Sequence, residues 1–233
     1  MGLPIQAAPT YRCVLPSDGR EITFRPFLVK EQKVLILARE SEDSKETLEA
    51  VKTLISNVTE GEVNANELPM VDMEYLFIKV RSVSVGEHST INLNCSNGEC
   101  RGTGEVVINL EEIVVEGEFP NDTVMISDNV GVVLKLIQVK DVDGMEEMHQ
   151  ADQMVEIVKR SIVRIFDEEN VYEASETSDK DLNDFIENLS FKQLEILGGF
   201  FDSVPKLKKE VEFKCNLCES VQTRMLEGLS SFF

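Results

Sequence analysis

Two stretches decide the fold of this chain: Cys95-Ser96-Asn97-Gly98-Glu99-Cys100 and Cys215-Asn216-Leu217-Cys218. Each is a short turn with a cysteine at either end, so each presents two sulfurs on the same side. Four thiolates delivered by two such turns suit tetrahedral zinc in a closed structural site. The spacing of the second pair is the more diagnostic. We therefore predict one metal site with Cys95, Cys100, Cys215 and Cys218 as ligands and Zn²⁺ as a structural cofactor.

The residues around both cysteine pairs alternate between apolar and polar, as half-buried strands do. The first pair lies between residues 90–94 and 104–110, and the second pair lies between residues 210–214 and 221–226. These patterns predict two hairpins that face each other across a metal, which is the arrangement of a zinc ribbon. Because a long stretch of chain separates the two halves, the metal would tie the two ends of the fold together.

The charge and the apolar runs of the chain limit its partners. The 233 residues carry a formal net charge of -20, and the pI is near 4.5. Binding to nucleic acid depends on clustered Lys and Arg contacts to phosphates, so we expect no nucleic-acid partner. No secretion signal is visible, and the longest apolar runs, such as residues 34–38, are too short to span a bilayer. We expect an intracellular protein without a membrane segment, whose reduced thiols favour metal over disulfides.

The rest of the sequence predicts hairpins and helices. An Asp-Gly turn at residues 17–20 indicates a hairpin that ends near residue 27. Apolar residues at helical spacing predict helices over residues 29–40, 44–58, 68–86, 145–166, 181–189 and 191–201. A further strand pair is expected at residues 124–126 and 132–136, and the acidic residues 167–179 are expected to form an exposed connector.

These elements predict an α+β protein. It would contain an N-terminal β-hairpin with helices, a split zinc-ribbon-like β unit and a C-terminal helical part. We expect the N-terminal hairpin and helical part in residues 1–89 and the first half of the split ribbon in residues 90–118. Residues 119–209 would hold a β-hairpin and the C-terminal helical part, and residues 210–233 the second half of the ribbon with the tail.

Other patterns in the chain indicate no active site. A Cys-x-x-Cys pair is also typical of thioredoxin-like redox centres, but no strand and helix of that kind surround Cys215. His88 is the alternative ligand if one cysteine does not reach the metal, and Cys13 is expected to be a small core residue. Because no catalytic or phosphate-binding motif occurs, we predict neither catalytic residues nor a small-molecule substrate.

The C-terminal end of the chain is apolar and aromatic. It reads Leu226-Glu227-Gly228-Leu229-Ser230-Ser231-Phe232-Phe233. Exposing two phenylalanines to water is unfavourable. The end therefore either folds back onto the core or anchors in a groove of a partner.

One run of the sequence resembles the N-terminal signature of the baseplate hub proteins of T4-like contractile-tailed bacteriophages: Ile22-Thr23-Phe24-Arg25-Pro26-Phe27-Leu28-Val29-Lys30-Glu31-Gln32-Lys33. Residues 72–81 with the Ser-x-Ser-x-Gly that follows, the two cysteine pairs and the ending at residues 226–233 are similar to that family as well. The resemblance covers most of the chain, apart from the first dozen residues and the acidic connector. Its most specific part is Phe-Arg-Pro-Phe-Leu-Val-Lys-Glu.

This resemblance implies a phage late protein, made in the host cytoplasm, that helps to build the central hub of the tail baseplate. It implies no enzymatic activity, and its partners would be other hub and tail proteins. The chain would be either a structural subunit kept in the virion or a chaperone of hub assembly. A strongly acidic surface suits both roles, since it complements a basic neighbour.

The alternative function is that of an intracellular zinc-ribbon adaptor unrelated to the virion. Such a protein needs a basic or aromatic face on the ribbon. Only Arg101, Lys214 and Arg224 lie beside the cysteine pairs as candidates, and acidic residues crowd them.

Overall fold

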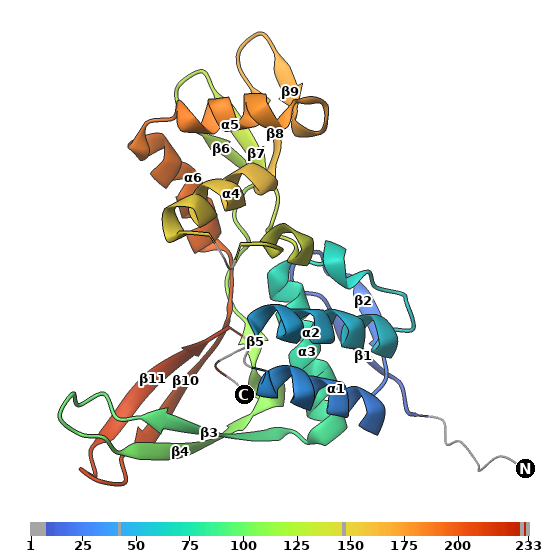
Figure 1. Cartoon of the computed structure of the whole chain (residues 1–233), viewed down its shortest axis with the longest axis vertical. Coiled ribbons are helices and arrows are strands. Elements are labelled where there is room, and N and C mark those ends of the chain that lie inside the picture. Colours follow the sequence, from blue (N-terminus) through green and yellow to red (C-terminus); the bar gives the residue numbers. More distant parts are fainter. Residues whose placement is uncertain (1–7, 42, 146–147, 229–230, 232–233) are drawn as a thin grey trace, which may run out of the picture. The chain divides into compact units, whose positions relative to one another are not determined.

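The structure is a computed structural model that describes residues 8–41, 43–145, 148–228 and 231 (Figure 1). The chain forms two compact units. Unit 1 consists of Met1–Ala65, Val71–Glu116 and Lys206–Phe233, and unit 2 consists of Asn66–Met70 and Gly117–Pro205. Both units combine helices with small antiparallel sheets, which confirms the predicted α+β class.

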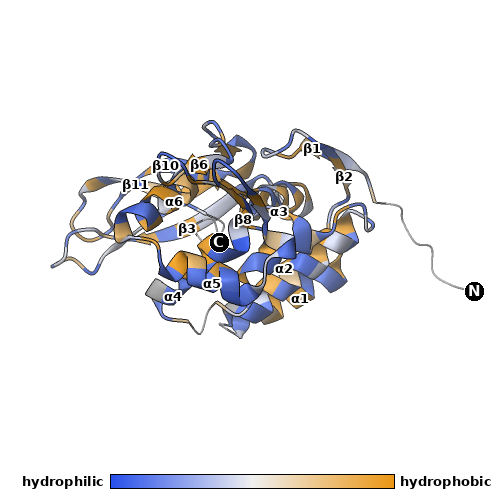
Figure 2. Ribbon diagram, turned by 90° about the horizontal axis from the view of Figure 1, so that it is seen from above, coloured by the Kyte–Doolittle hydropathy of each residue, from blue (hydrophilic) through white to orange (hydrophobic). Residues whose placement is uncertain are grey.

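Unit 1 begins with a β-hairpin and then continues in helices. Strand β1 (Tyr11–Val14) pairs antiparallel with β2 (Glu21–Phe24), and Gly19 adopts the positive φ of 72° that the predicted Asp-Gly turn needs. The α-helices are α1 (Val29–Glu40), α2 (Ser44–Val58) and α3 (Met70–Val85). Helices α1 and α2 have the predicted bounds. Both contain apolar as well as polar residues along their length (Figure 2). The 3-10 helices of the chain are η1 (Ala65–Glu67), η2 (Leu110–Glu112), η3 (Val139–Val142) and η4 (Ala174–Glu176).

The turn between β2 and α1 is held by one buried carboxylate. Glu31 accepts two hydrogen bonds from the Arg25 guanidinium, at 2.8 and 3.0 Å, and one from the Leu28 N–H at 2.7 Å. The contact with the Leu28 N–H satisfies a donor just before the helix. Glu31 is the third residue of α1, which is the position that supplies this bond in a capping box. The hydrogen bond from Arg25 lowers the pKa of Glu31. The stretch that carries the family resemblance most specifically is therefore a compact structural element.

The core of unit 1 is formed by helices α2 and α3 together with the hairpin. Its largest fully buried side chains include Leu15 and Ile22 of the hairpin region, Ile55 of α2, and Leu76 and Ile78 of α3. Helix α2 is capped by Asp43, which accepts the N–H groups of Lys45 and Glu46. Helix α2 therefore forms where apolar periodicity and capping coincide.

Two facing hairpins complete unit 1, as predicted. Strand β3 (His88–Asn94) pairs with β4 (Thr103–Asn109), and β10 (Leu207–Lys214) pairs with β11 (Val221–Glu227). The short strand β5 (Val114–Val115), which the sequence patterns did not predict, pairs with the other edge of β10. Burial alternates along β3 and β4, so one face of the first hairpin is apolar and covered.

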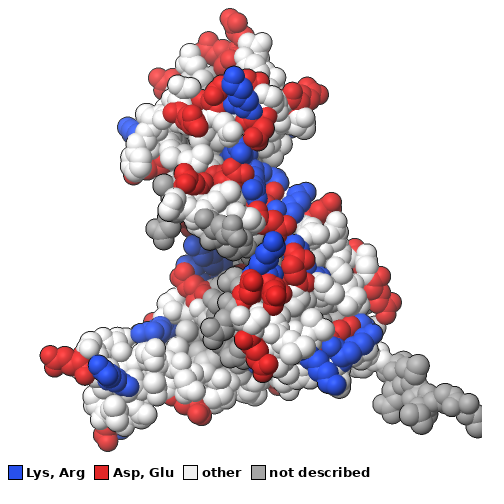
Figure 3. Space-filling model, in the orientation of Figure 1, with Lys and Arg blue, Asp and Glu red and all other residues white. Residues whose placement is uncertain are grey.

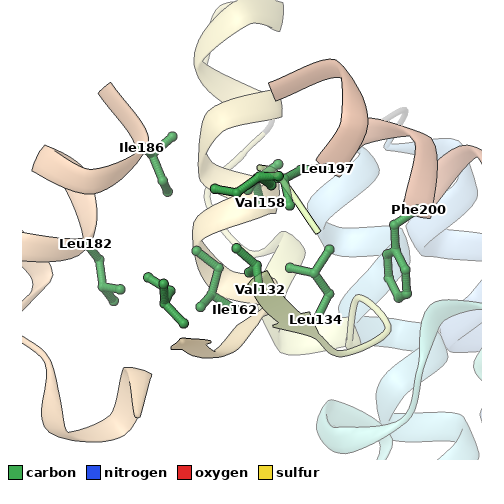
Figure 4. Packing of buried hydrophobic residues seen from close by; sticks show 10 residues of the cluster. Val132, Leu134, Val158, Ile162, Leu182, Ile186, Leu197 and Phe200 are labelled. Carbon is green, nitrogen blue, oxygen red and sulfur yellow. The ribbon is translucent and has the colours of Figure 1, made fainter. Parts of the chain in front are cut away.

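Among its described residues, unit 2 contains a four-stranded antiparallel sheet and the α-helices α4 (Gln150–Ser161), α5 (Asp179–Glu187) and α6 (Phe191–Ser203). The strands, in sheet order, are β6 (Thr123–Met125), β7 (Gly131–Leu134), β8 (Ile162–Phe166) and β9 (Val171–Glu173). A capping box begins α6, because Ser190 and Gln193 bond to each other's backbone N–H. The helices and the sheet share one core that includes Val132, Val158 and Leu197 (Figure 4).

The prediction of one helix over residues 145–166 is wrong at both ends. Helix α4 begins at Gln150 and ends at Ser161, and the residues that follow form β8. The apolar β-branched residues Ile162 and Ile165 fit the helical period, but they pack better in a strand that pairs with both β7 and β9. Strand β9 falls in the predicted connector, where the Asp167 side chain accepts two backbone N–H groups and shapes the turn.

Two further predictions concern the membrane and the C-terminal end. Among the described residues, no helix has both the length and the apolar character needed to cross a bilayer. Phe232 and Phe233 lie outside the described residues.

Candidate metal centre

The four predicted ligands lie together at the tips of the two facing hairpins. The sulfur atoms of Cys95, Cys100, Cys215 and Cys218 all lie within 4.8 Å of one another. The Sγ atoms of Cys95 and Cys218 are 3.7 Å apart, and so are those of Cys100 and Cys215. Tetrahedral zinc with Zn–S bonds of about 2.3 Å places its sulfurs about 3.8 Å apart. The donor set therefore matches a four-thiolate zinc site in both number and spacing.

Each cysteine pair is held in its turn by backbone hydrogen bonds. In the first turn the Cys95 N–H donates to the Gly102 carbonyl, and the Cys100 N–H donates to the Asn97 carbonyl, both at 2.9 Å. In the second turn the Cys215 N–H donates to the Ser220 carbonyl at 3.0 Å. These bonds fix the backbone of each turn, so both cysteines of a pair stay at the same tip.

The two turns approach each other so closely that glycine is required between them. A Cβ atom on Gly102 would lie 2.5 Å from the Cys215 Sγ. A Cβ atom on Gly104 would collide with the ring of Phe213 and lie 2.8 Å from the Lys214 carbonyl oxygen. Small residues at these two positions therefore let the first hairpin reach the second.

A pair of hydrogen bonds joins the turns beside the sulfurs. The Asn216 N–H donates to the Thr103 carbonyl at 2.8 Å, and the Thr103 N–H donates to the Asn216 side-chain oxygen at 3.0 Å. Asn216 therefore has a structural role within the second cysteine pair, between Cys215 and Cys218.

The four thiols differ in burial and in pKa. Cys215 is buried, Cys95 and Cys100 are half-buried, and Cys218 is exposed. The Ser220 hydroxyl lowers the pKa of Cys218 to about 6, and the Asn97 N–H lowers the pKa of Cys95. The Gly102 N–H favours the Cys100 thiolate, but burial and the neighbouring cysteines outweigh it and raise the pKa of Cys100 to about 11. At neutral pH Cys218 thus already favours the thiolate that a metal needs.

The other two residues considered from the sequence lie apart from this cluster. His88 begins β3 opposite Asn109 and does not belong to the group of possible metal ligands among the described residues. Cys13 lies half-buried in β1, where burial raises its pKa to about 11. Sequence patterns missed Ser220 and Gln222, whose side chains contact the cysteine sulfurs.

Neither the curated proteins nor the solved structures give a match. A family model described as T4 bacteriophage base plate protein matches residues 8–233, a span that includes both cysteine pairs and the Arg25–Glu31 turn. The resemblance seen in the sequence is confirmed at the level of this family. The chain belongs to the T4 bacteriophage base plate protein family.

Proposed function

We propose that this protein is a non-catalytic component of the hub of a phage tail baseplate, and that it acts in baseplate assembly through contacts with other hub and tail proteins. The observation that carries the proposal is the family match over residues 8–233. Family membership favours this role over that of an unrelated zinc-ribbon adaptor. The protein acts either as a subunit retained in the virion or as a chaperone that assists hub assembly in the host cytoplasm.

The proposal includes a structural Zn²⁺ bound by Cys95, Cys100, Cys215 and Cys218. Two observations support this. The four sulfurs have the spacing of a four-thiolate zinc site, and each pair of sulfurs in close contact joins one cysteine from each hairpin. Four thiolates fill a tetrahedral shell, so no position remains open for water or substrate. The metal would therefore stabilise the ribbon and would not take part in catalysis.

Helix α1 offers a surface for the proposed protein contacts. Val29, Ile36 and Leu37 are 70 %, 49 % and 65 % exposed, although apolar side chains of this size are usually covered. Lys30 and Lys33 are exposed on the same helix, and Figure 3 shows basic side chains gathered over one end of α1. In a strongly acidic chain this combination fits one kind of partner, a baseplate protein with an apolar surface edged by carboxylates.

Quantitative mass spectrometry with lysine cross-linking tests the function. The chain is measured in purified particles and in infected-cell lysate. A fixed copy number per particle identifies a structural subunit, whereas lysate complexes with hub proteins and absence from particles identify a chaperone.

In either case we expect Lys30 and Lys33 to cross-link to a baseplate protein more than Lys180 and Lys192 of unit 2, which are also exposed. Absence from both particles and hub complexes would contradict the proposal.

A further inference from the structure

A glutamine side chain lies against the exposed side of the cysteine cluster. Gln222 is on β11, two residues after Ser220 and on the covered face of its strand. Its Nε2 group donates to the Cys95 sulfur at 2.9 Å and to the Ser220 Oγ at 2.8 Å. Both hydrogens of the side-chain amide are therefore used, and one of them goes directly to a proposed metal ligand.

The orientation of this amide follows from a third contact. The Ser96 N–H donates to the Gln222 Oε1 at 2.8 Å. Because a backbone N–H cannot face another donor, the oxygen must lie on that side and the NH₂ group must face Cys95. The backbone next to the ligand thus determines that Gln222 donates to the sulfur.

The second amide hydrogen extends the contact to Cys218. Ser220 accepts from Gln222, and its Oγ lies 3.1 Å from the Cys218 sulfur. With zinc bound, the Cys218 sulfur would be a thiolate, which can only accept, and the serine hydroxyl would then donate to it. Gln222 therefore acts on both sulfurs of the more exposed pair, directly on Cys95 and through Ser220 on Cys218.

A neighbouring side chain on the same strand fixes the first turn. The Arg224 Nη2 donates to the Ser96 Oγ at 2.9 Å and to the Asn94 carbonyl at 3.4 Å. Arg224 contacts the residues on either side of Cys95, whereas Gln222 contacts the sulfur itself. The two residues share the covered face of β11, but only the glutamine bonds to a ligand sulfur.

We infer that Gln222 is a positioning residue of the metal centre, which orients Cys95 directly and Cys218 through Ser220 and so strengthens zinc binding. This inference rests on the proposed function of the four cysteines as zinc ligands. Hydrogen-bond donors to metal ligands fix the ligand orientation and commonly change metal affinity by about 10–100-fold when they are removed. Without Gln222 the turn around Cys95 would keep its backbone conformation, but the Cys95 sulfur would lose its fixed direction.

Competition for zinc against a chromophoric chelator tests the inference with the full chain. We expect Gln222→Leu to raise the zinc dissociation constant by about 10–100-fold while the stoichiometry stays the same. The matched control is Thr223→Val, which changes the next residue of β11 on the exposed face. Ser220→Ala is a second variant, with a smaller expected increase, because it removes only the indirect contact to Cys218. It carries the test if Gln222→Leu does not fold.

Cobalt spectra separate positioning from a merely structural role. In the Co²⁺-loaded protein the thiolate-to-cobalt charge-transfer band reports the electron density on the sulfurs, so Gln222→Leu should shift it and Thr223→Val should not. Equal zinc affinities and superimposable cobalt spectra for these two variants would overturn the inference while leaving the zinc site in place. A wild-type protein that takes up no zinc would instead overturn the metal centre itself, together with this role of Gln222.

Discussion

Replacement of Cys215 by serine is expected to remove the zinc and to destabilise unit 1 strongly. Cys215 is only 1 % exposed, so water cannot easily substitute for its sulfur as a ligand. Zinc present at about 1,000 times its dissociation constant stabilises a folded protein by about 4 kcal/mol. At roughly 2–4 °C per kcal/mol for chains of this size, the melting temperature should fall by roughly 8–16 °C. Metal analysis and calorimetry of the purified variant measure both effects.

The fifth cysteine of the chain provides the matched control. Cys13 lies in β1, outside the cysteine cluster, so Cys13→Ser should keep the full zinc content and lose little stability. Cys218→Ser should behave like Cys215→Ser, because both hairpins need all four sulfurs to close the site. If the Cys215→Ser protein kept its zinc and its melting temperature, the four-cysteine site would be wrong.

The second large effect is expected for Glu31→Gln in the turn between β2 and α1. The substitution leaves the Arg25 guanidinium, whose side chain is only 17 % exposed, without its carboxylate partner. Breaking a buried ion pair by removing one partner costs about 3–5 kcal/mol. Since Arg25 keeps some contact with water, we expect about 3 kcal/mol at neutral pH, at the lower end of that range. Urea denaturation of both proteins measures this difference in the free energy of unfolding.

The pH dependence of this effect has a defined sign. The pKa of Glu31 is lower in the folded protein than in the unfolded chain, chiefly because of the hydrogen bond from Arg25. Its stabilisation is therefore present above the ordinary glutamate pKa and is lost as the pH falls through the lowered value. The difference between Glu31→Gln and the wild type should shrink on acidification.

Glu21→Gln is the control for the buried ion pair. Glu21 pairs with Arg12 at 3.4 Å on the surface, and both side chains are more than half exposed. Exposed pairs of this kind contribute about 0–1 kcal/mol, so the variant should unfold close to the wild type. Equal effects of the two substitutions would show that the Arg25–Glu31 contact does not hold the turn.

Local sequence patterns were sufficient for much of unit 1. Helices α1 and α2 begin and end where the patterns placed them, and at α2 the apolar stripe coincides with the Asp43 cap. The strands beside the cysteines alternate clearly, and their pairing follows from the turns that join them. The same patterns predicted the two hairpins whose tips bring all four proposed ligands together.

The misassigned segment shows where such patterns reach their limit. Residues Val158 and Ile162 continue one apolar stripe, so the helical period gives no signal at the end of α4. What ends the helix is the pairing of β8 with β7 and β9, a contact with distant residues that local spacing does not contain.

Gln222 was missed for a related reason. It is one polar residue in an alternating strand, and 127 positions separate it from Cys95. Only the antiparallel register of β11 with β10, together with the close approach of the first hairpin, brings the amide to the sulfur. A sequence pattern identifies ligands by their chemistry, whereas the residues that orient the ligands are found from geometry.

X-ray absorption at the zinc edge of the purified full chain tests the metal centre most directly. The account predicts one zinc per chain with four sulfur ligands at about 2.3 Å and no nitrogen or oxygen in the first shell. A shell that contains nitrogen or oxygen ligands, or a reduced protein that takes up no zinc, would contradict it.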